Sequence, residues 1–240
     1  MKKPLLFISI FAVISIISVY FIYQHFVPDE FLTEEDMRSE FSLADRERTI
    51  QDVIKVDDQT YFVPYQFGEE AYGASVWVWL DGKWENVGDG TTSGLHLLST
   101  DQGKEYVYWN VHPDDRVEKW ETVMKFDRNY RIFSPDGKVQ HEIYYPGIEF
   151  KKEFESGNKT YGIVELPEEW SEQAAFEEEF PTEPSMIPSK NAFTYEWQAF
   201  DEDGEVIVHL ENTLEEGGGG TFGGNYARPL SQVSLQESEE

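Results

Sequence analysis

The chain has 240 residues, 47 of them acidic and 19 basic, which gives a formal net charge of -28, and it contains no cysteine. Without cysteine there are no disulfides, no thiolate metal sites and no cysteine nucleophile. The negative charge excludes nucleic acid as a partner, because its phosphates require neutralisation by Lys and Arg. Hydrophobic residues at 40% and aromatic residues at 15% are too frequent for a disordered acidic tail, so we expect a packed core.

An apolar segment near the N-terminus predicts a membrane anchor. Lys2 and Lys3 precede an uncharged run over residues 5–23. As a helix this run spans roughly 28 Å, close to the ~30 Å hydrocarbon core of a bilayer. The alternative is a cleaved signal peptide, but the run is long for one and no Ala-x-Ala-like site follows it. We therefore expect an uncleaved transmembrane helix over residues 5–27, with the lipid bilayer as its partner.

The charges that flank this segment predict its orientation. Both lysines precede it, whereas Asp29, Glu30 and several further carboxylates follow it. The positive-inside rule then places residues 1–4 in the cytoplasm and the remainder outside, as a single-pass protein of the cell membrane. An acidic exported domain is repelled by anionic lipids and attracts cations or a basic partner, although high charge also simply maintains solubility.

The next part of the chain changes from a helical to a strand-like pattern. Residues 28–48 form a charged juxtamembrane spacer, in which Thr33 and Asp36 have the spacing of a capping box. Over residues 49–212 a period of two predicts an extracytoplasmic β domain. The strand-like runs are 50–56, 60–67, 74–80, 83–87, 105–111, 116–126, 129–133, 138–145, 148–154, 160–166, 193–200 and 205–211. Because turns separate most of them, we predict a mainly β fold, as an antiparallel meander, sandwich or barrel.

One helix interrupts the strands, and the chain ends in a tail of different composition. Pro167 suits a first helical position, Glu168 favours the helix N-terminus, and Pro181 ends the pattern, so a helix is predicted at about 167–180. Residues 213–240 are rich in glycine and acidic residues, which predicts a flexible tail.

Several short patterns resemble catalytic or metal-binding motifs but lack the context that the chemistry needs. The glycines of 218–223 cannot open a βαβ unit, since too little chain follows them. The Ser-x-x-Lys pattern at 156–159 lies in a Gly-Asn turn, and the ligand positions of a calcium loop fail around 201–205. His112-Pro113-Asp114-Asp115 is either a turn or an acid–base or metal site. We expect no cofactor and no metal, and the sequence identifies no catalytic residue.

The most informative group of residues is aromatic. If Asp81-Gly82 is a two-residue turn, Trp79 pairs with Trp84, and Trp77 lies on the same face opposite Asn86. Val76 and Val78 then occupy the other face. Such a tryptophan pair contributes about 0.5–1.5 kcal/mol beyond the area that it buries.

Two interpretations of this group remain open. The strand is buried on both sides, which is the commoner environment of such residues, or one face is an aromatic platform that stacks on sugar rings or flat apolar ligands. Trp109, at the end of the run Tyr106–Trp109, presents the same alternative on a second strand. Under the second interpretation the ligand-binding candidates are Trp77, Trp79, Trp84 and Trp109.

The sequence is compatible with three functions. The first is non-catalytic binding or assembly at the cell envelope, with an envelope protein or a glycan as partner, and we favour it over an enzyme. The alternative is an envelope glycan hydrolase that uses two carboxylates about 5–9.5 Å apart. The third is a subunit of a larger membrane complex that docks through the predicted helix at 167–180.

Overall fold

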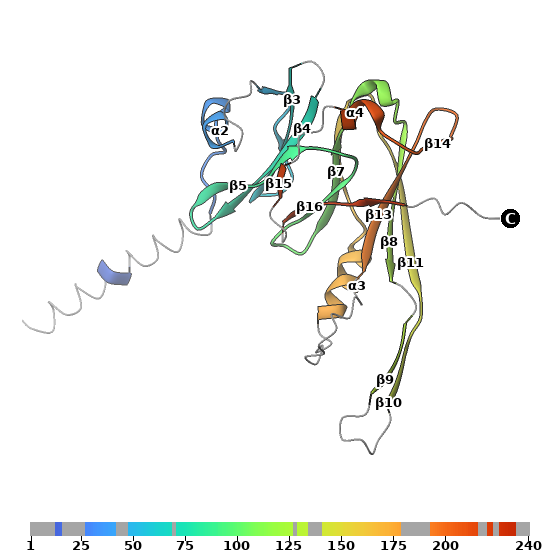
Figure 1. The fold of residues 1–240 in the computed structure, drawn as a ribbon. Helices are drawn as coiled ribbons and strands as arrows, with labels where there is room; N and C mark the ends of the chain where they lie inside the picture. Colours follow the sequence, from blue (N-terminus) through green and yellow to red (C-terminus); the bar gives the residue numbers. More distant parts are fainter. Residues whose placement is uncertain are drawn as a thin grey trace, which may run out of the picture.

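A computed structural model describes residues 13–15, 27–41, 48–68, 71–126, 129–133, 141–178, 193–215, 220–222 and 226–233. Over these ranges the chain is mainly β, with antiparallel sheets and a few short helices (Figure 1), which confirms the mainly β, antiparallel part of the predicted fold class. The predicted anchor over residues 5–27 lies outside the described residues apart from the helical residues 13–15 and Val27. Within the described ranges, no helix has the length and apolar character needed to cross a membrane.

Three sheets carry the fold, and we name them A, B and C. Sheet A has six strands: β1 (Arg48–Ile50), β2 (Ile54–Lys55), β3 (Thr60–Phe67), β4 (Ala71–Leu80), β5 (Lys83–Thr91) and β15 (Gly220–Phe222). Sheet B has four: β6 (His96–Ser99), β7 (Glu105–Asn110), β12 (Tyr161–Glu165) and β16 (Ala227–Pro229). Sheet C has five: β8 (Lys119–Phe126), β11 (Ile148–Glu155), β13 (Thr194–Phe200), β14 (Val206–Ile207) and β17 (Ser231–Gln232). All described pairings are antiparallel except β17 with β13.

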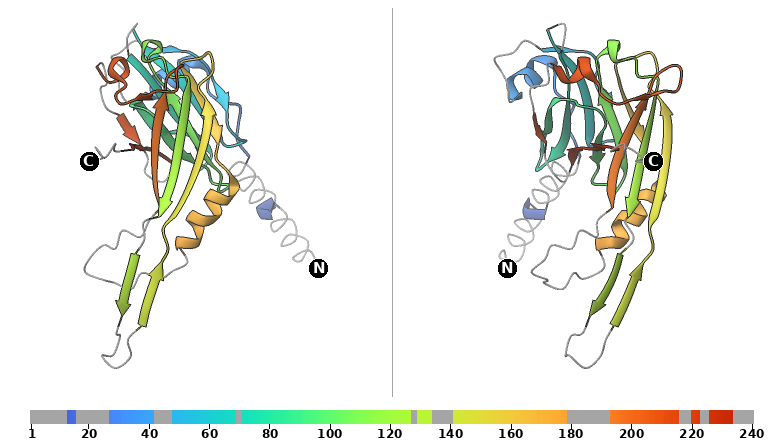
Figure 2. Two further views of the ribbon diagram at one scale, coloured as in Figure 1. Left: turned by 90° about the vertical axis from the view of Figure 1, so that its right-hand side faces the viewer. Right: turned by 45° about the vertical axis from the view of Figure 1, so that its right-hand side comes forward.

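The three sheets form successive layers, with sheet B in the middle (Figures 1 and 2). Tyr106 and Tyr108 of β7 belong to the core shared with sheet A, whereas Val107 and Trp109 belong to the core shared with sheet C. Because side chains alternate along a strand, a strand between two cores needs apolar residues at every position. This requirement explains the uninterrupted run of aromatic and apolar residues in β7.

A long hairpin extends from sheet C. The pairing of β8 with β11 is followed by a separate two-stranded ladder of β9 (Asn129–Phe133) and β10 (His141–Tyr145), which projects beyond the layered body (Figures 1 and 2). Among the described strands, β9 and β10 pair only with each other. We call residues 127–147 the projecting arm, of which the structure describes 129–133 and 141–147.

Four short helical segments accompany the sheets in the described residues. The sequence had predicted only one helix within the β domain. They are α2 (Glu34–Glu40), η1 (Pro113–Asp115), α3 (Glu168–Glu178) and α4 (Glu211–Glu215). The helix predicted at about 167–180 is α3, and its Trp170 is buried in the core between sheets B and C. The predicted strand 205–211 is shorter than expected, because only Val206–Ile207 pair with β13 before α4 begins.

The prediction of a flexible tail over 213–240 is wrong for the residues that the structure describes there. β15 pairs with β5, β16 with β6, and β17 with β13. Gly220 shows why the glycines were misleading: a Cβ at this position would lie 2.5 Å from the backbone oxygen of Asp89. Glycine is needed here for close strand approach, and it does not indicate mobility.

Candidate functional site

The β4–β5 hairpin has the register that the sequence predicted. Trp79 pairs with Trp84, and Trp77 pairs with Asn86, so both predictions are confirmed. Asp81 and Gly82 have φ values of 52° and 82°, the left-handed backbone of a two-residue hairpin turn. The rings of Trp79 and Trp84 meet edge to face, with their centroids 5.4 Å apart.

All four candidate tryptophans lie in the protein core. Trp77 is 0% exposed, Trp79 5%, Trp84 9% and Trp109 2%. None of them is therefore an open surface on which a sugar ring could stack, and the interpretation as a strand buried on both sides is the one that fits. Trp77, Trp79 and Trp84 lie together on the outer face of sheet A, whereas Trp109 lies apart from them in the core between sheets B and C.

The cover over the outer face of sheet A comes from residues 29–41, which we call the N-terminal strap. Phe31 stacks on Tyr61 with ring centroids 3.9 Å apart and an interplanar angle of 12°, and its edge meets Trp84 at 5.0 Å. Met37 and Phe41 are buried in the same cluster. At the start of the strap, the indole Nε1 of Trp84 donates a hydrogen bond of 3.3 Å to the backbone oxygen of Asp29.

The helix of the strap, α2, forms for a local reason that the sequence predicted. The Thr33 hydroxyl accepts a hydrogen bond of 3.3 Å from the Asp36 backbone N–H, and the Asp36 carboxylate accepts one of 3.2 Å from the Thr33 backbone N–H. This capping box satisfies two N–H groups that a helix start leaves unpaired. A helix of seven residues is too short to persist alone in water, so α2 depends on the burial of Met37 against sheet A.

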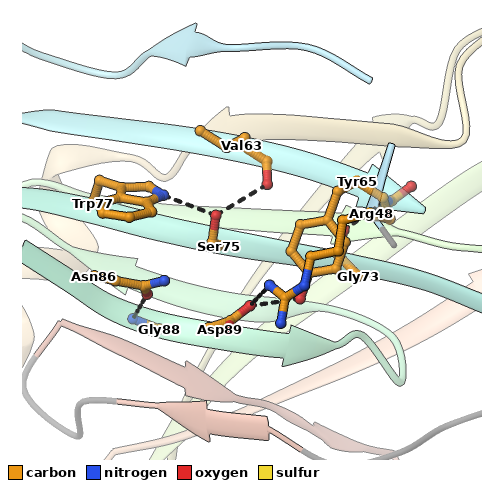
Figure 3. Close-up of polar contacts among 10 residues, drawn as sticks. Arg48, Val63, Tyr65, Gly73, Ser75, Trp77, Asn86, Gly88 and Asp89 are labelled. Atoms are coloured by element: carbon orange, nitrogen blue, oxygen red, sulfur yellow. Dashed lines mark hydrogen bonds and ion pairs between the residues drawn. The ribbon is translucent and has the colours of Figure 1, made fainter. Parts of the chain in front are cut away.

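A buried ion pair between Arg48 and Asp89 joins strands β1 and β5 of sheet A (Figure 3). Arg48 Nη1 is 2.7 Å from Asp89 Oδ1, and the Tyr65 hydroxyl donates a hydrogen bond of 2.6 Å to the same oxygen. The guanidinium carbon lies 4.0 Å from the ring centroid of Phe41 and 4.8 Å from that of Phe67. These rings offset part of the cost of burying a cation whose Nε and Nη2 make no hydrogen bond to any residue that the structure describes. The group fastens β1, β3 and β5 to the strap.

The surroundings of Tyr65 keep its hydroxyl protonated. Burial, together with the neighbouring Asp89 carboxylate, raises the pKa of Tyr65 far above its usual range. Because the phenol stays neutral, it serves as a hydrogen-bond donor to Asp89 at any physiological pH. The polar contacts nearby are of the same structural kind: Trp77 Nε1 donates to the Ser75 hydroxyl at 2.9 Å (Figure 3).

Trp109 packs in the core between sheets B and C. Its ring lies 5.4 Å from Phe154 and 5.9 Å from Trp120, measured between centroids. On the neighbouring strand, Gly162 makes room for it, because a Cβ at that glycine would lie 2.2 Å from the indole. The indole therefore occupies a space created by the absence of a side chain.

His112-Pro113-Asp114-Asp115 forms a turn, as one of the two interpretations of this segment expects. His112 Nδ1 accepts a hydrogen bond of 3.1 Å from the Asp114 backbone N–H. The buried carboxylate of Asp115 accepts bonds of 3.0 Å from the backbone N–H groups of both Asn212 and Thr213, at the start of α4. This carboxylate holds η1 and α4 together.

The sequence did not predict the burial of two polar residues that are important for the fold. Arg48 is one of them, since no local sequence pattern distinguishes it from an ordinary exposed charged residue. Asn110 is also buried, and its Nδ2 donates to the backbone oxygens of Tyr65 and Gly73 at 2.9 and 2.6 Å, which links sheet B to sheet A. Their partners are distant in sequence, so no local pattern could have identified them.

Within the described parts of the chain, no group of three or more His, Asp or Glu residues is arranged to hold a metal ion. Comparison with known proteins finds no matching family model, no matching curated protein and no matching solved structure.

Proposed function

We propose that this protein is a single-pass membrane protein whose β domain lies outside the cytoplasm and acts there by non-catalytic binding or assembly. The observation that carries the proposal is the N-terminal strap. Its contacts with sheet A begin at Asp29, two residues after the predicted anchor over 5–27. A segment that leaves the bilayer and immediately becomes part of the fold suits a domain that works at the membrane surface.

Two further features support binding or assembly. The β domain carries a large excess of negative charge, which favours cationic or basic partners over anionic ones. The projecting arm extends β9 and β10 away from the body (Figure 1). Its Tyr144 is 54% exposed. A two-stranded ladder with no further strand is marginally stable in water, so a partner that packs on the arm would stabilise it.

The glycan hydrolase alternative receives no comparable support. Its sugar-stacking platform depended on tryptophans that are in fact buried. Of the buried carboxylates, Asp89 pairs with Arg48, and Asp115 caps α4. Burial raises the pKa of Glu105, but this carboxylate accepts a hydrogen bond of 2.7 Å from the Tyr195 hydroxyl, which opposes the rise.

A topology experiment tests the proposed location, and the lack of cysteine makes it direct. The variant Glu202→Cys places one thiol in an exposed turn of the β domain, and Pro4→Cys places one before the apolar segment. In intact cells, a membrane-impermeant maleimide should label the first variant, and it should label the second only after permeabilisation. Equal labelling of both variants in intact cells, or of neither, would contradict the proposal.

A crosslinking experiment tests the proposed activity. A photoreactive amino acid at position 144 should give a discrete crosslinked product in native membranes, because this position is exposed on the projecting arm. The same amino acid at position 202, exposed on the body, is the matched control. The absence of any product from position 144 that position 202 lacks would count against binding through the arm.

A further inference from the structure

The N-terminal strap leaves almost no free chain between the predicted anchor and the β4–β5 hairpin. The last anchor residue, Val27, is separated from Asp29 only by Pro28. Two residues of extended chain span at most about 7 Å, and the proline ring restricts the backbone further. Because Asp29 accepts the indole hydrogen bond of Trp84, this end of β5 must lie close to the point where the chain leaves the bilayer.

The strap is held to sheet A along its whole length, so it cannot act as a hinge. Phe31 contacts Tyr61 and Trp84 near the start of the strap, whereas Met37 and Phe41 are buried further along. Movement of the domain relative to the anchor would pull these aromatic and apolar side chains out of their cluster and into water. The orientation of sheet A is thus set by the same contacts that hold the strap.

Trp84 is the second residue of β5 and follows the turn Asp81–Gly82 by one residue. At about 3.3 Å per residue, the turn lies within about 10 Å of Trp84. In Figure 1, the described residues 13–15 lie on the sheet A side of the layered body, away from sheet C. The turn therefore belongs to the part of the β domain nearest the anchor.

We propose that the turn at Asp81–Lys83 rests in the headgroup layer of the bilayer, which makes the lipid surface itself a binding partner of the β domain. This inference rests on the proposed function, because it needs residues 5–27 to span the membrane. The side chain of Lys83 is 68% exposed and is 2.9 Å from Glu85, so this tip carries both signs of charge.

The charged side chains near the Asp81–Lys83 turn determine which kind of lipid headgroup can bind there. Asp29, Glu30 and Asp81 are exposed carboxylates around the exit point, and they repel anionic headgroups. A zwitterionic headgroup offers a phosphate to Lys83 and a cationic group to these carboxylates. The partner is therefore a zwitterionic lipid surface, such as phosphatidylcholine.

The test uses the full chain in phosphatidylcholine vesicles, with one environment-sensitive fluorophore on Lys83→Cys or on Glu202→Cys. Lipids that carry a spin label on the headgroup quench a fluorophore only within a short distance. We expect quenching of at least half of the emission at position 83 and less than a tenth at position 202. Replacement of half of the phosphatidylcholine by phosphatidylglycerol should reduce quenching at position 83, because the carboxylates around the exit point are then repelled by the anionic headgroups.

A variant of the N-terminal strap tests whether the strap holds the Asp81–Lys83 turn against the headgroup layer. Phe31→Ala should lower quenching at position 83 while the chain still floats with the vesicles, and the exposed substitution Val208→Ala should change nothing. A chain that floats with vesicles yet shows equal quenching at positions 83 and 202 overturns the inference and leaves the anchor intact. A chain that does not associate with vesicles overturns the proposed function instead.

Discussion

His96 is a buried imidazole held between aromatic rings. Its ring centroid lies 5.2 Å from that of Tyr108 and 4.9 Å from that of Phe222, and its Nε2 has no hydrogen-bond partner within the described part of the chain. Burial lowers the pKa of His96 to about 4. In the native protein the imidazole is therefore neutral over the physiological range of pH.

This imidazole makes the stability of the fold depend on pH. The unfolded chain binds a proton at His96 near pH 6.5, whereas the native state binds one only near pH 4, so acidification favours unfolding. Between pH 7.5 and 5.5, we expect His96 to lower the free energy of unfolding by about 1.3 kcal/mol, from 1.36 kcal/mol per unit of pKa shift. Urea denaturation at pH 7.5 and at pH 5.5 measures this difference in the free energy of unfolding. His96→Phe should lose this component, and an unchanged pH dependence in that variant would contradict the assignment.

The ion pair of Arg48 and Asp89 should show the asymmetry typical of buried charges. Asp89→Asn leaves the guanidinium buried without a counter-charge and should cost about 3–5 kcal/mol of unfolding free energy. Adding Arg48→Met to this variant removes the unpaired charge and should restore part of the loss. Chemical denaturation of the single and double variants checks the order. A double variant less stable than Asp89→Asn alone would contradict this expectation and would show that Arg48 stabilises the fold through its packing on the aromatic rings even without a counter-charge.

The local sequence predicted which residues pair across a hairpin, but it did not predict whether those residues are buried. Asp81-Gly82 and the period of two fixed the pairing of Trp79 with Trp84, because the turn type and the alternation act over a few residues. The burial of this pair depends on Phe31, which is about fifty residues away, so the sequence left core and platform as alternatives. Arg48 is likewise 41 residues away in sequence from Asp89, the carboxylate that neutralises it.

At the scale of elements, the N-terminal strap should stabilise the fold through a few side chains. Met37→Ala removes a buried side chain that is 1% exposed, and we expect a loss of about 2–4 kcal/mol in unfolding free energy. Because the strap covers Trp77 and Trp84, the tryptophan emission should also shift to longer wavelength. The exposed substitution Val53→Ala is the control and should change neither quantity. A stable Met37→Ala variant with unshifted emission would show that the strap is dispensable.

The projecting arm should contribute little to the stability of the layered body. Phe126 pairs with Ile148 at its base, so replacing residues 127–147 by Asn-Gly closes β8 and β11 with a two-residue turn. The shortened chain should unfold with a free energy within about 1 kcal/mol of the full chain, since β9 and β10 pair with no strand of the layered body that the structure describes. Thermal and urea denaturation measure this. A loss of several kcal/mol would show that the arm is part of the folding unit.

Elements bounded by turn chemistry were predicted well, and those without it were missed. The predicted strands 60–67 and 129–133 match β3 and β9 in full, because each is long or has clear limits. β15, β16 and β17 are two or three residues long and their pairing partners are remote, whereas β6 has four residues and pairs with both the next strand, β7, and the remote β16. Strands this short carry too few residues to show alternation, so only tertiary pairing defines them.

At the scale of the whole molecule, the order of the sheets could not be predicted. The sequence indicated antiparallel neighbours and left a meander, a sandwich and a barrel open. The observed arrangement of three layers follows from the two-sided burial of sheet B, with Tyr108 facing one core and Trp109 the other. Only the run of apolar residues in β7 pointed to it, and the same run was compatible with an exposed aromatic face.

The segment Gly220–Gln232 adds one strand to each of the three layers: β15 to sheet A, β16 to sheet B and β17 to sheet C. In chain order these three strands follow every other strand that the structure describes in the sheets, so they are synthesised after them. Each of the three layers therefore keeps an incomplete edge until this segment has emerged from the ribosome or from an export channel. A nascent chain stalled before residue 220 would expose these edges, and it would be a preferred substrate for chaperones and quality-control proteases.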